Sequence, residues 1–517
     1  MANDPDLDPP DLDPQPLACD RRQLLKGIAA AGVASAFGLA GCARAHQPDL
    51  VRAENARPGT TDWLLTNTRV DARKHFRCPW IEGYCSRTSL RAGERLALMV
   101  STNPPSPFVI DLYRMGYYGA TGGRHMARLG PFQGRVQPDP ELGPERLREC
   151  RWEPAVELTI PGDWPSGVYL GKLTAEREGL QSYLIFIVRD DRRCDLLVQA
   201  SDHTWAAYNR WPHRASLYDN GIKTWYWGPG VRVSFNRPYG KYCQILDAPL
   251  SQGSGEFLLW ELPLVYWLEY HGHDVSYIGN ADTHADPAGL LRAKLWISVG
   301  HDEYWSRAMH DNVKAARDAG VSLAFLSGNT CFGVVDVHAG HDGAAHRAIR
   351  RIGQYGPIDP RNVRDGFTEM LDLKQNGPDE SLLIGARSSY PLTGGADWVC
   401  VAPRHWIFEG TGMEQGDRVP GLVGWEWHGD PAEIPGLEVV AQGFIRRWGG
   451  APRYTATVYP GPKGNFVFNG ATCWWSDGLA APPGYQHPAL GRAQPQGPDA
   501  RIQRITANLI RRAVAGA

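Results

Sequence analysis

The sequence predicts two folded regions. The first is an antiparallel β-sandwich over residues 61–190, and the second is an α/β domain over residues 191–517 with a parallel sheet of the glutamine-amidotransferase or flavodoxin type. Three observations predict this. A chain of 517 residues is long enough for two or three domains. With 43% apolar and 21% charged residues, the composition is that of a packed globular protein. The pattern of apolar runs also changes near Cys194.

Residues 1–42 are expected to be an export signal and not part of the fold. Arg21 and Arg22 precede an apolar run that ends in Leu39-Ala40-Gly41-Cys42. The paired arginines resemble a twin-arginine export signal, and the last four residues resemble a lipobox, in which Cys42 is lipidated. We therefore expect an exported protein that a lipid at Cys42 anchors to the membrane, on the periplasmic or extracellular face. An uncleaved short helix is the alternative.

Residues 43–60 have the composition of a polar linker, and short strands separated by Gly- and Pro-containing turns follow. The clearest strand patterns lie at residues 95–100, 107–113, 156–160 and 182–188. No long helix pattern interrupts them, which favours a sandwich of antiparallel sheets. This region contains no cluster of catalytic residue types, so we expect it to be a structural or sugar-binding module.

After Cys194, continuous apolar runs typical of buried strands alternate with helix patterns. The strands are expected at residues 195–200, 295–299, 321–326 and 465–469, and the helices at residues 257–270, 306–319 and 500–514. Ser306 can cap the start of the second helix, and Gly320 can end it. This alternation predicts a parallel sheet that is covered on both faces.

Ligands of open parallel sheets bind beyond the carboxyl ends of the strands. Polar and ionisable side chains follow three of the predicted strands, at residues 201–211, 300–305 and 327–330. His301-Asp302-Glu303 is the densest of these clusters. The alternative interpretation is that these acids lie at the N-terminus of a helix, where negative charge is favourable. The adjacent Tyr304 and Trp305 favour a functional site instead.

Other classes of site have weaker support. Residues 336–342 contain two histidines and two aspartates, but the glycine among them and the absence of a helix or strand pattern predict a flexible loop. No GxSxG elbow and no CxxC pair occur, so neither a serine hydrolase nor a zinc ribbon is expected. With 54 basic and 56 acidic residues the net charge is −2, which argues against a nucleic-acid partner. Cys78 and Cys85 are the candidate disulfide pair closest in sequence, and the connectivity stays open.

Several motifs together resemble the large (beta) subunit family of N,N-dimethylformamidase, over residues 75–517. The most specific motif is Gly-His-Asp-Glu-Tyr-Trp at residues 300–305. The others lie at residues 81–84, 113–119, 163–169, 208–211, 216–219, 235–239, 328–329 and 470–475.

The resemblance implies a mononuclear iron held by two tyrosine phenolates and one glutamate. The matching residues are Glu303, Tyr208 and Tyr239, with Tyr218 as the rival for the second tyrosine. His301 is then an acid/base group, and Asn329 is a hydrogen-bonding group on the substrate side. Three anionic oxygen ligands suit ferric iron. The implied activity is hydrolysis of a small amide or another non-peptide C–N bond, in which metal-activated water attacks a polarised carbonyl.

The sequence departs from the family pattern at residues expected to line the pocket. Pro212 and His213 stand where the family tends to have glycine, and Cys331 and Phe332 replace a more aromatic stretch. The resemblance therefore does not identify the substrate. It also leaves open whether the protein forms a homo-oligomer or assembles with a small partner subunit. The alternatives are a non-catalytic envelope protein that binds a glycan or peptide and, last, an amidotransferase-like hydrolase with a nucleophile.

Overall fold

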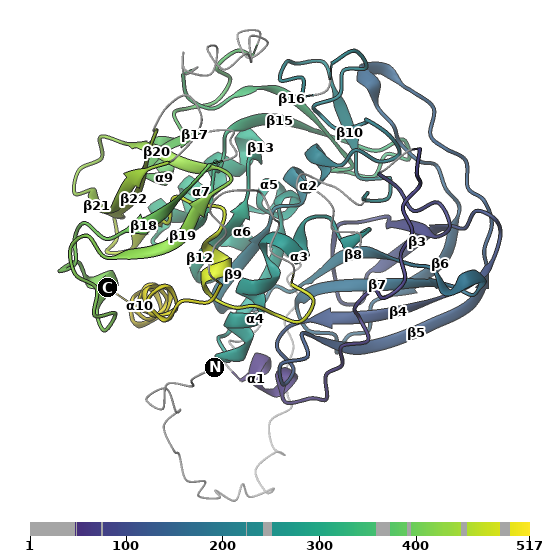
Figure 1. The fold of residues 1–517 in the computed structure, drawn as a ribbon, viewed down its shortest axis with the longest axis horizontal. Helices are drawn as coiled ribbons and strands as arrows, with labels where there is room; N and C mark the ends of the chain where they lie inside the picture. The colour runs from purple at the N-terminus through teal and green to yellow at the C-terminus, as the bar shows by residue number, and fades with distance from the viewer. Residues whose placement is uncertain are drawn as a thin grey trace, which may run out of the picture. The chain divides into compact units, whose positions relative to one another are not determined.

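Strands dominate the chain, in several sheets with few helices between them (Figure 1). The computed structural model describes residues 47, 49–73, 76–223, 225–240, 251–357, 373–389, 394–445, 452–485 and 497–516. All of them belong to one compact unit, Ala43–Ala517, which contains both of the regions expected as domains. Arg21, Arg22 and Cys42 lie outside the described residues. Within the described ranges, no helix has both the length and the apolar character that a membrane crossing requires.

The first region forms two sheets. One has the order β1-β3-β6, and the other has the order β2-β8-β7-β4-β5, in which only the β2–β8 pair is parallel. Alternate side chains of β3, including Leu96 and Leu98, share a core with Ile110 of β4 and Leu173 of β7. The strands are β1 (Glu82–Cys85), β2 (Ser89–Arg91), β3 (Arg95–Ser101), β4 (Pro107–Met115), β5 (Gly123–Gln133), β6 (Pro154–Thr159), β7 (Gly167–Ala175) and β8 (Gln181–Arg189).

The central sheet of the second region has the order β11-β9-β12-β14-β23-β22-β21. Its first five strands are parallel; β22 then pairs antiparallel with β23, and β21 pairs antiparallel with β22. The four strands predicted from apolar runs are confirmed as β9, β12, β14 and β23, whose residues are nearly all buried. The bounds are β9 (Cys194–Ala200), β11 (Val275–Gly279), β12 (Ala293–His301), β14 (Ser322–Gly328), β21 (Glu438–Phe444), β22 (Arg453–Pro460) and β23 (Phe466–Asn469).

Two of the three predicted helices are confirmed. In α7 (Arg307–Ala319), the Ser306 side chain accepts a hydrogen bond from the Met309 N–H, and Gly320 adopts a left-handed φ of 109°. The last helix is α10 (Ala500–Ala515). The expected helix over residues 257–270 is divided into α3 (Phe257–Trp260) and α4 (Leu262–Tyr270), because Pro263 has no N–H to continue the hydrogen bonding of α3.

A four-stranded sheet has the order β10-β16-β15-β13. Its strands are β10 (Arg232–Ser234), β13 (Tyr304–Trp305), β15 (Gly333–His338) and β16 (Ala348–Gln354). The prediction of a loop over residues 336–342 is wrong for its first part, because Asp336 to His338 lie in β15. There the Asp336 carboxylate accepts a 2.7 Å hydrogen bond from Arg350 of β16, so the acid belongs to a cross-strand pair.

The remaining elements are short. Part of the expected linker is helical, as α1 (Leu50–Asn55). The others are α2 (Asp202–Tyr208), α5 (Asn280–Ala285), α6 (Pro287–Leu290), α9 (Ser381–Ile384), β17 (Ala386–Ser389), β18 (Gly395–Val399), β19 (Arg418–Gly424) and β20 (Trp427–Pro431). Cys78 and Cys85 are both buried and free, so they form no disulfide with each other.

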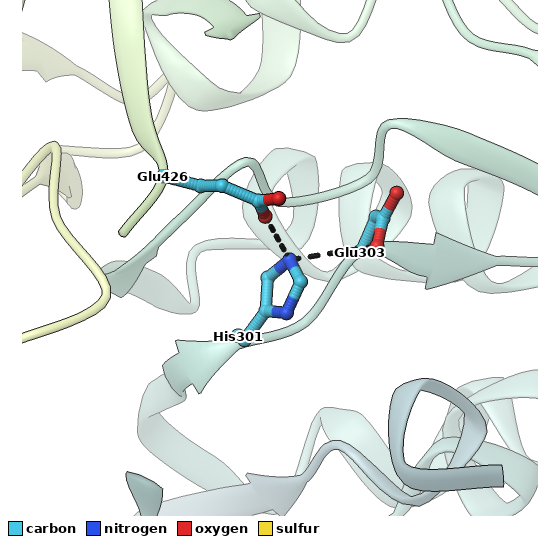
Figure 2. Close-up of side chains that lie close together, drawn as sticks. All are labelled: His301, Glu303 and Glu426. Atoms are coloured by element: carbon cyan, nitrogen blue, oxygen red, sulfur yellow. Dashed lines mark ion pairs between the residues drawn. The ribbon is translucent and has the colours of Figure 1, made fainter. Parts of the chain in front are cut away.

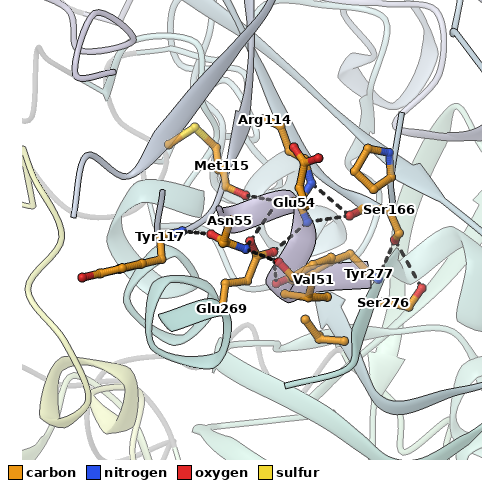
Figure 3. Close-up of polar contacts among 12 residues, drawn as sticks. Val51, Glu54, Asn55, Arg114, Met115, Tyr117, Ser166, Glu269, Ser276 and Tyr277 are labelled. Carbon is orange, nitrogen blue, oxygen red and sulfur yellow. Dashed lines mark hydrogen bonds and ion pairs between the residues drawn. The ribbon is translucent and has the colours of Figure 1, made fainter. Parts of the chain in front are cut away.

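A buried ion pair joins four of these elements (Figure 3). Arg114 of β4 donates hydrogen bonds of 2.7 and 2.8 Å to the two carboxylate oxygens of Glu269 on α4, and neither side chain is more than 1% exposed. The same carboxylate accepts 2.9 Å from the Tyr277 hydroxyl of β11 and 2.8 Å from the Asn55 amide of α1. Each carboxylate oxygen thus accepts hydrogen bonds from two donors, and the ion pair links α1, β4, α4 and β11.

Glu269→Gln should lower the free energy of unfolding by about 3–5 kcal/mol, because it removes the carboxylate that pairs directly with the buried Arg114 guanidinium. Lys314→Gln is the matched control, since it breaks an exposed 3.0 Å pair with Asp318 and should cost at most about 0.5 kcal/mol. Chemical denaturation followed by circular dichroism measures both. Equal unfolding midpoints for the two variants would contradict the structural role given to Glu269.

Candidate functional site

The predicted polar edge of the central sheet contains the candidate site. Strand β12 ends at His301, and α2, which starts just after β9, ends at Tyr208. Near the end of β12, Gly300 has a left-handed φ of +71°, and a Cβ atom there would lie 2.4 Å from Cβ of Trp260. Only glycine tolerates both conditions, so the strand can pass close to Trp260 before it ends at His301, whose ring lies 6.4 Å from that of Trp260.

Glu303 lies against a set of phenols. The Tyr208 hydroxyl donates a 2.6 Å hydrogen bond to Glu303 Oε2, and the Tyr218 hydroxyl lies 2.5 Å from that of Tyr208 and 3.2 Å from the same carboxylate oxygen. The Tyr304 hydroxyl in turn hydrogen-bonds that of Tyr218. All four side chains are buried. We call Tyr208, Tyr218, Tyr304 and Glu303 the phenol–carboxylate cluster.

Two buried arginines hold the backbone that carries the phenols. Arg237 donates 3.1 and 3.0 Å hydrogen bonds to the carbonyls of Ala206 and Asn209, at the C-terminal end of α2. Arg351 donates 3.1 and 2.9 Å hydrogen bonds to the carbonyls of Leu217, which precedes Tyr218, and of Tyr226.

Arg351 also reaches the cluster itself, because its Nη1 donates 3.2 Å to the Tyr304 hydroxyl. The positions of Tyr208 and Tyr218 therefore depend on charge-assisted hydrogen bonds to main-chain oxygens.

His301 lies between two carboxylates (Figure 2). Its Nε2 pairs with Glu426 Oε2 and lies 3.5 Å from Glu303 Oε2. One ligand atom from each of the three residues falls within 4.8 Å of the others, and all three side chains are buried. The Asn329 amide donates 3.1 Å to Glu426 Oε2, which fixes the orientation of that carboxylate. The segment Trp425-Glu426 brings its acid to the site from between β19 and β20.

The charges in the site oppose one another. Burial lowers the pKa of the His301 imidazole, but Glu426 and then Glu303 outweigh it and raise the pKa to about 9. Burial and the nearby Glu426 raise the pKa of the Glu303 carboxyl, and burial and Glu303 raise the pKa values of Tyr208 and Tyr218 well above the ordinary phenol value. A negative charge on any one of these carboxyl and phenol groups therefore disfavours ionisation of the others. A cation bound among them would instead favour their ionised forms.

The structure brings together most of the residues predicted from the sequence. Tyr208, His301, Glu303 and Asn329 all lie in or beside the cluster. Tyr239 packs against the same hydrophobic cluster as Tyr208 and Tyr218, and its ring lies 6.3 Å from that of Trp205. The phenol that accompanies Tyr208 at Glu303 is Tyr218, which the sequence left as the rival.

The residues at which the sequence departs from the family pattern lie in two places. The N–H groups of Cys331 and Phe332 donate to the main-chain carbonyls of Asp302 and Glu303, at 3.0 and 2.9 Å. Pro212 is buried, whereas His213 is exposed with its ring 6.0 Å from Phe76. Residues 331–332 therefore support the backbone of the site, and His213 lies at the surface.

Sequence reasoning missed Glu426 and the part played by the Tyr304 hydroxyl. Glu426 is far from His301 along the chain, and only the folded sheet brings them together. The signal that could have found it is an acid flanked by two tryptophans, Trp425 and Trp427. An acid in so apolar a segment is unusual unless it has a buried partner.

Sequence comparisons with known proteins agree on one family. Residues 109–488 match the family described as N,N-dimethylformamidase beta subunit-like, C-terminal. The chain is 27% identical over 232 residues to an N,N-dimethylformamidase beta subunit of Alcaligenes sp, and 26% identical over 230 residues to that of Paracoccus aminophilus. Each match covers 37% of this chain and 29% of the relative, so the chain matches less than a third of the length of these relatives.

Solved structures add no information about the fold. A superoxide reductase (neelaredoxin) from Ignicoccus hospitalis matches with a TM-score of 0.14 and 13% identity, over 21% of this chain and 82% of that one. A β-glucuronidase from Parabacteroides merdae matches with a TM-score of 0.17 and 9% identity, over 69% of this chain and 43% of that one. Neither score is high enough to carry an argument.

Proposed function

The chain belongs to the N,N-dimethylformamidase beta subunit-like family, and we propose that it is a metal-dependent hydrolase of a small amide or another non-peptide C–N bond. The observation that carries the proposal is the buried contact of Glu303 with two phenols, next to a histidine held between carboxylates. The names of the two relatives support the amide as the substrate class.

Ferric iron is the metal that we propose, held by Tyr208, Tyr218 and Glu303. These residues fit it, because their hydroxyl and carboxylate oxygens lie within 2.5 to 3.3 Å of one another in a buried site. Anionic oxygen donors suit a hard trivalent cation better than zinc or copper. Tyr218 thereby replaces Tyr239 as the second tyrosine. When bound, such a cation acts as a Lewis acid toward a carbonyl and toward water.

His301 supplies the proton transfer in this proposal. Hydrolysis breaks the C–N bond, adds the hydroxyl of water to the carbonyl carbon and requires a proton for the departing amine. The Nε2 of His301 can give that proton, because Glu426 and Glu303 stabilise the imidazolium form. Glu426 also orients the ring, and the Asn329 amide holds Glu426 in place.

Tyr218→Phe should remove most of the bound iron and the visible phenolate-to-iron absorption, because it deletes one of three anionic donors. Tyr239→Phe is the matched control and should retain both. Metal analysis and the visible spectrum of proteins purified from iron-replete cells provide the measurement. Loss of iron in the Tyr239 variant with retention in the Tyr218 variant would restore the first assignment.

His301→Ala should retain its iron but hydrolyse amides about 10² to 10⁴-fold more slowly, since it removes a proton donor and not a ligand. Release of amine from N,N-dialkyl formamides gives the rate, and metal analysis gives the iron content. His125→Ala, a change on the partly exposed face of β5, should alter neither quantity. Loss of iron in the His301 variant would show that this residue is a ligand.

We also propose that the protein is exported by the twin-arginine route and anchored at Cys42, and that it assembles with a second subunit or with itself, as the beta-subunit names of its relatives suggest.

Cys42→Ala should move the protein from the membrane fraction to the soluble fraction after cell lysis, because a single thiol carries the lipid. Immunoblotting of the two fractions is the measurement. An unchanged distribution of the protein between the two fractions would refute the lipid anchor and would leave the proposed hydrolase activity untouched.

A further inference from the structure

The phenol–carboxylate cluster is buried, so any substrate must reach it past a neighbouring side chain. The described aromatic and cationic groups around the Tyr218 ring are Tyr208 at 4.5 Å, Trp227 at 4.9 Å, Arg351 at 5.0 Å, Trp225 at 5.7 Å and Tyr304 at 6.4 Å. Of these, Trp225 is 44% exposed, whereas each of the others is at most 3% exposed. Among these neighbours of Tyr218, Trp225 is the side chain that reaches the solvent, so it lies between Tyr218 and the surface.

We propose that Trp225 is the entrance residue of the site, whose indole ring screens Tyr218 from solvent and limits the size of the amide that can enter. The size limit for amides rests on the proposed function. The screening of Tyr218 rests on the contacts of Trp225 alone.

The contacts of Trp225 suit this role. Its ring has the Arg210 guanidinium 5.3 Å from its centre, and Arg210 is paired at 3.0 and 3.2 Å with the carboxylate of Asp219, the residue after Tyr218. The next residue, Tyr226, donates its N–H to the Tyr218 carbonyl at 2.8 Å. The indole is therefore fixed against the chain segment that carries the phenol and does not sit on an independent loop.

The backbone supports a functional interpretation. Trp225 has φ of +63°, in the left-handed region that a bulky residue rarely adopts. A conformation of this kind costs free energy and tends to persist where it serves a site. At this position the large aromatic ring lies 5.7 Å from the ring of Tyr218 and is 44% exposed.

Hydroxyl-radical footprinting with residue-level mass spectrometry tests the access role with or without bound metal. Trp225→Ala should raise the labelling of Tyr218 several-fold, and Trp225→Phe, which keeps a smaller ring, should raise it less. Ile222→Ala is the matched control, since Ile222 is 97% exposed in the same segment, and it should leave Tyr218 protected. Unchanged labelling in Trp225→Ala, or equal increases at Tyr218 and at the remote buried Tyr277, would overturn the inference.

A second measurement tests the size limit. The kcat/KM of an N,N-diethyl amide relative to its N,N-dimethyl homologue should rise in Trp225→Ala and stay constant in Ile222→Ala. An unchanged ratio in an active Trp225 variant would overturn the size limit. If neither protein hydrolyses amides while the labelling of Tyr218 rises as expected, the proposed function fails and the access role of Trp225 stands.

Discussion

The contact of the Glu303 carboxylate with the phenols of Tyr208 and Tyr218 holds the site together. A carboxylate taken out of water is costly unless hydrogen-bond donors or a counter-charge replace the water. The donors come from α2 and from the segment after it, while Glu303 itself follows β12. The parallel order of β9 and β12 is what brings these segments to one edge. Arg237 and Arg351 then hold the backbone that carries the phenols.

Glu303 also joins two chemically different groups. On one side it meets oxygen donors that suit a hard cation, and on the other it meets His301, whose charge Glu426 stabilises. In the proposed hydrolase, the first group holds the metal and the second supplies the proton for the departing amine. In that proposal the two glutamates have different roles: Glu303 is a ligand, and Glu426 keeps the imidazolium in place.

Much of this arrangement could be predicted from the sequence, because apolar runs identify buried parallel strands and such strands end at one edge. That rule placed Tyr208, His301, Glu303 and Asn329 together. It says nothing of Tyr218 or Tyr239, which lie in irregular segments, and there the family resemblance favoured Tyr239 over Tyr218. Glu426 was missed because it reaches the site from a strand connection more than a hundred residues away. The division of the helix at Glu261 depends on a single proline, Pro263, whose effect the apolar pattern masks.

A crystal structure of the iron-replete protein, with data collected at the iron absorption edge, would locate the metal and identify its ligands. We expect one anomalous peak within bonding distance of the Tyr208 and Tyr218 hydroxyls and the Glu303 carboxylate. A peak bound instead by Tyr239, or by His301 and Glu426 alone, would contradict the assignment of ligands. Absence of any peak in a fully folded protein from iron-replete cells would contradict the proposal of a metal-dependent hydrolase.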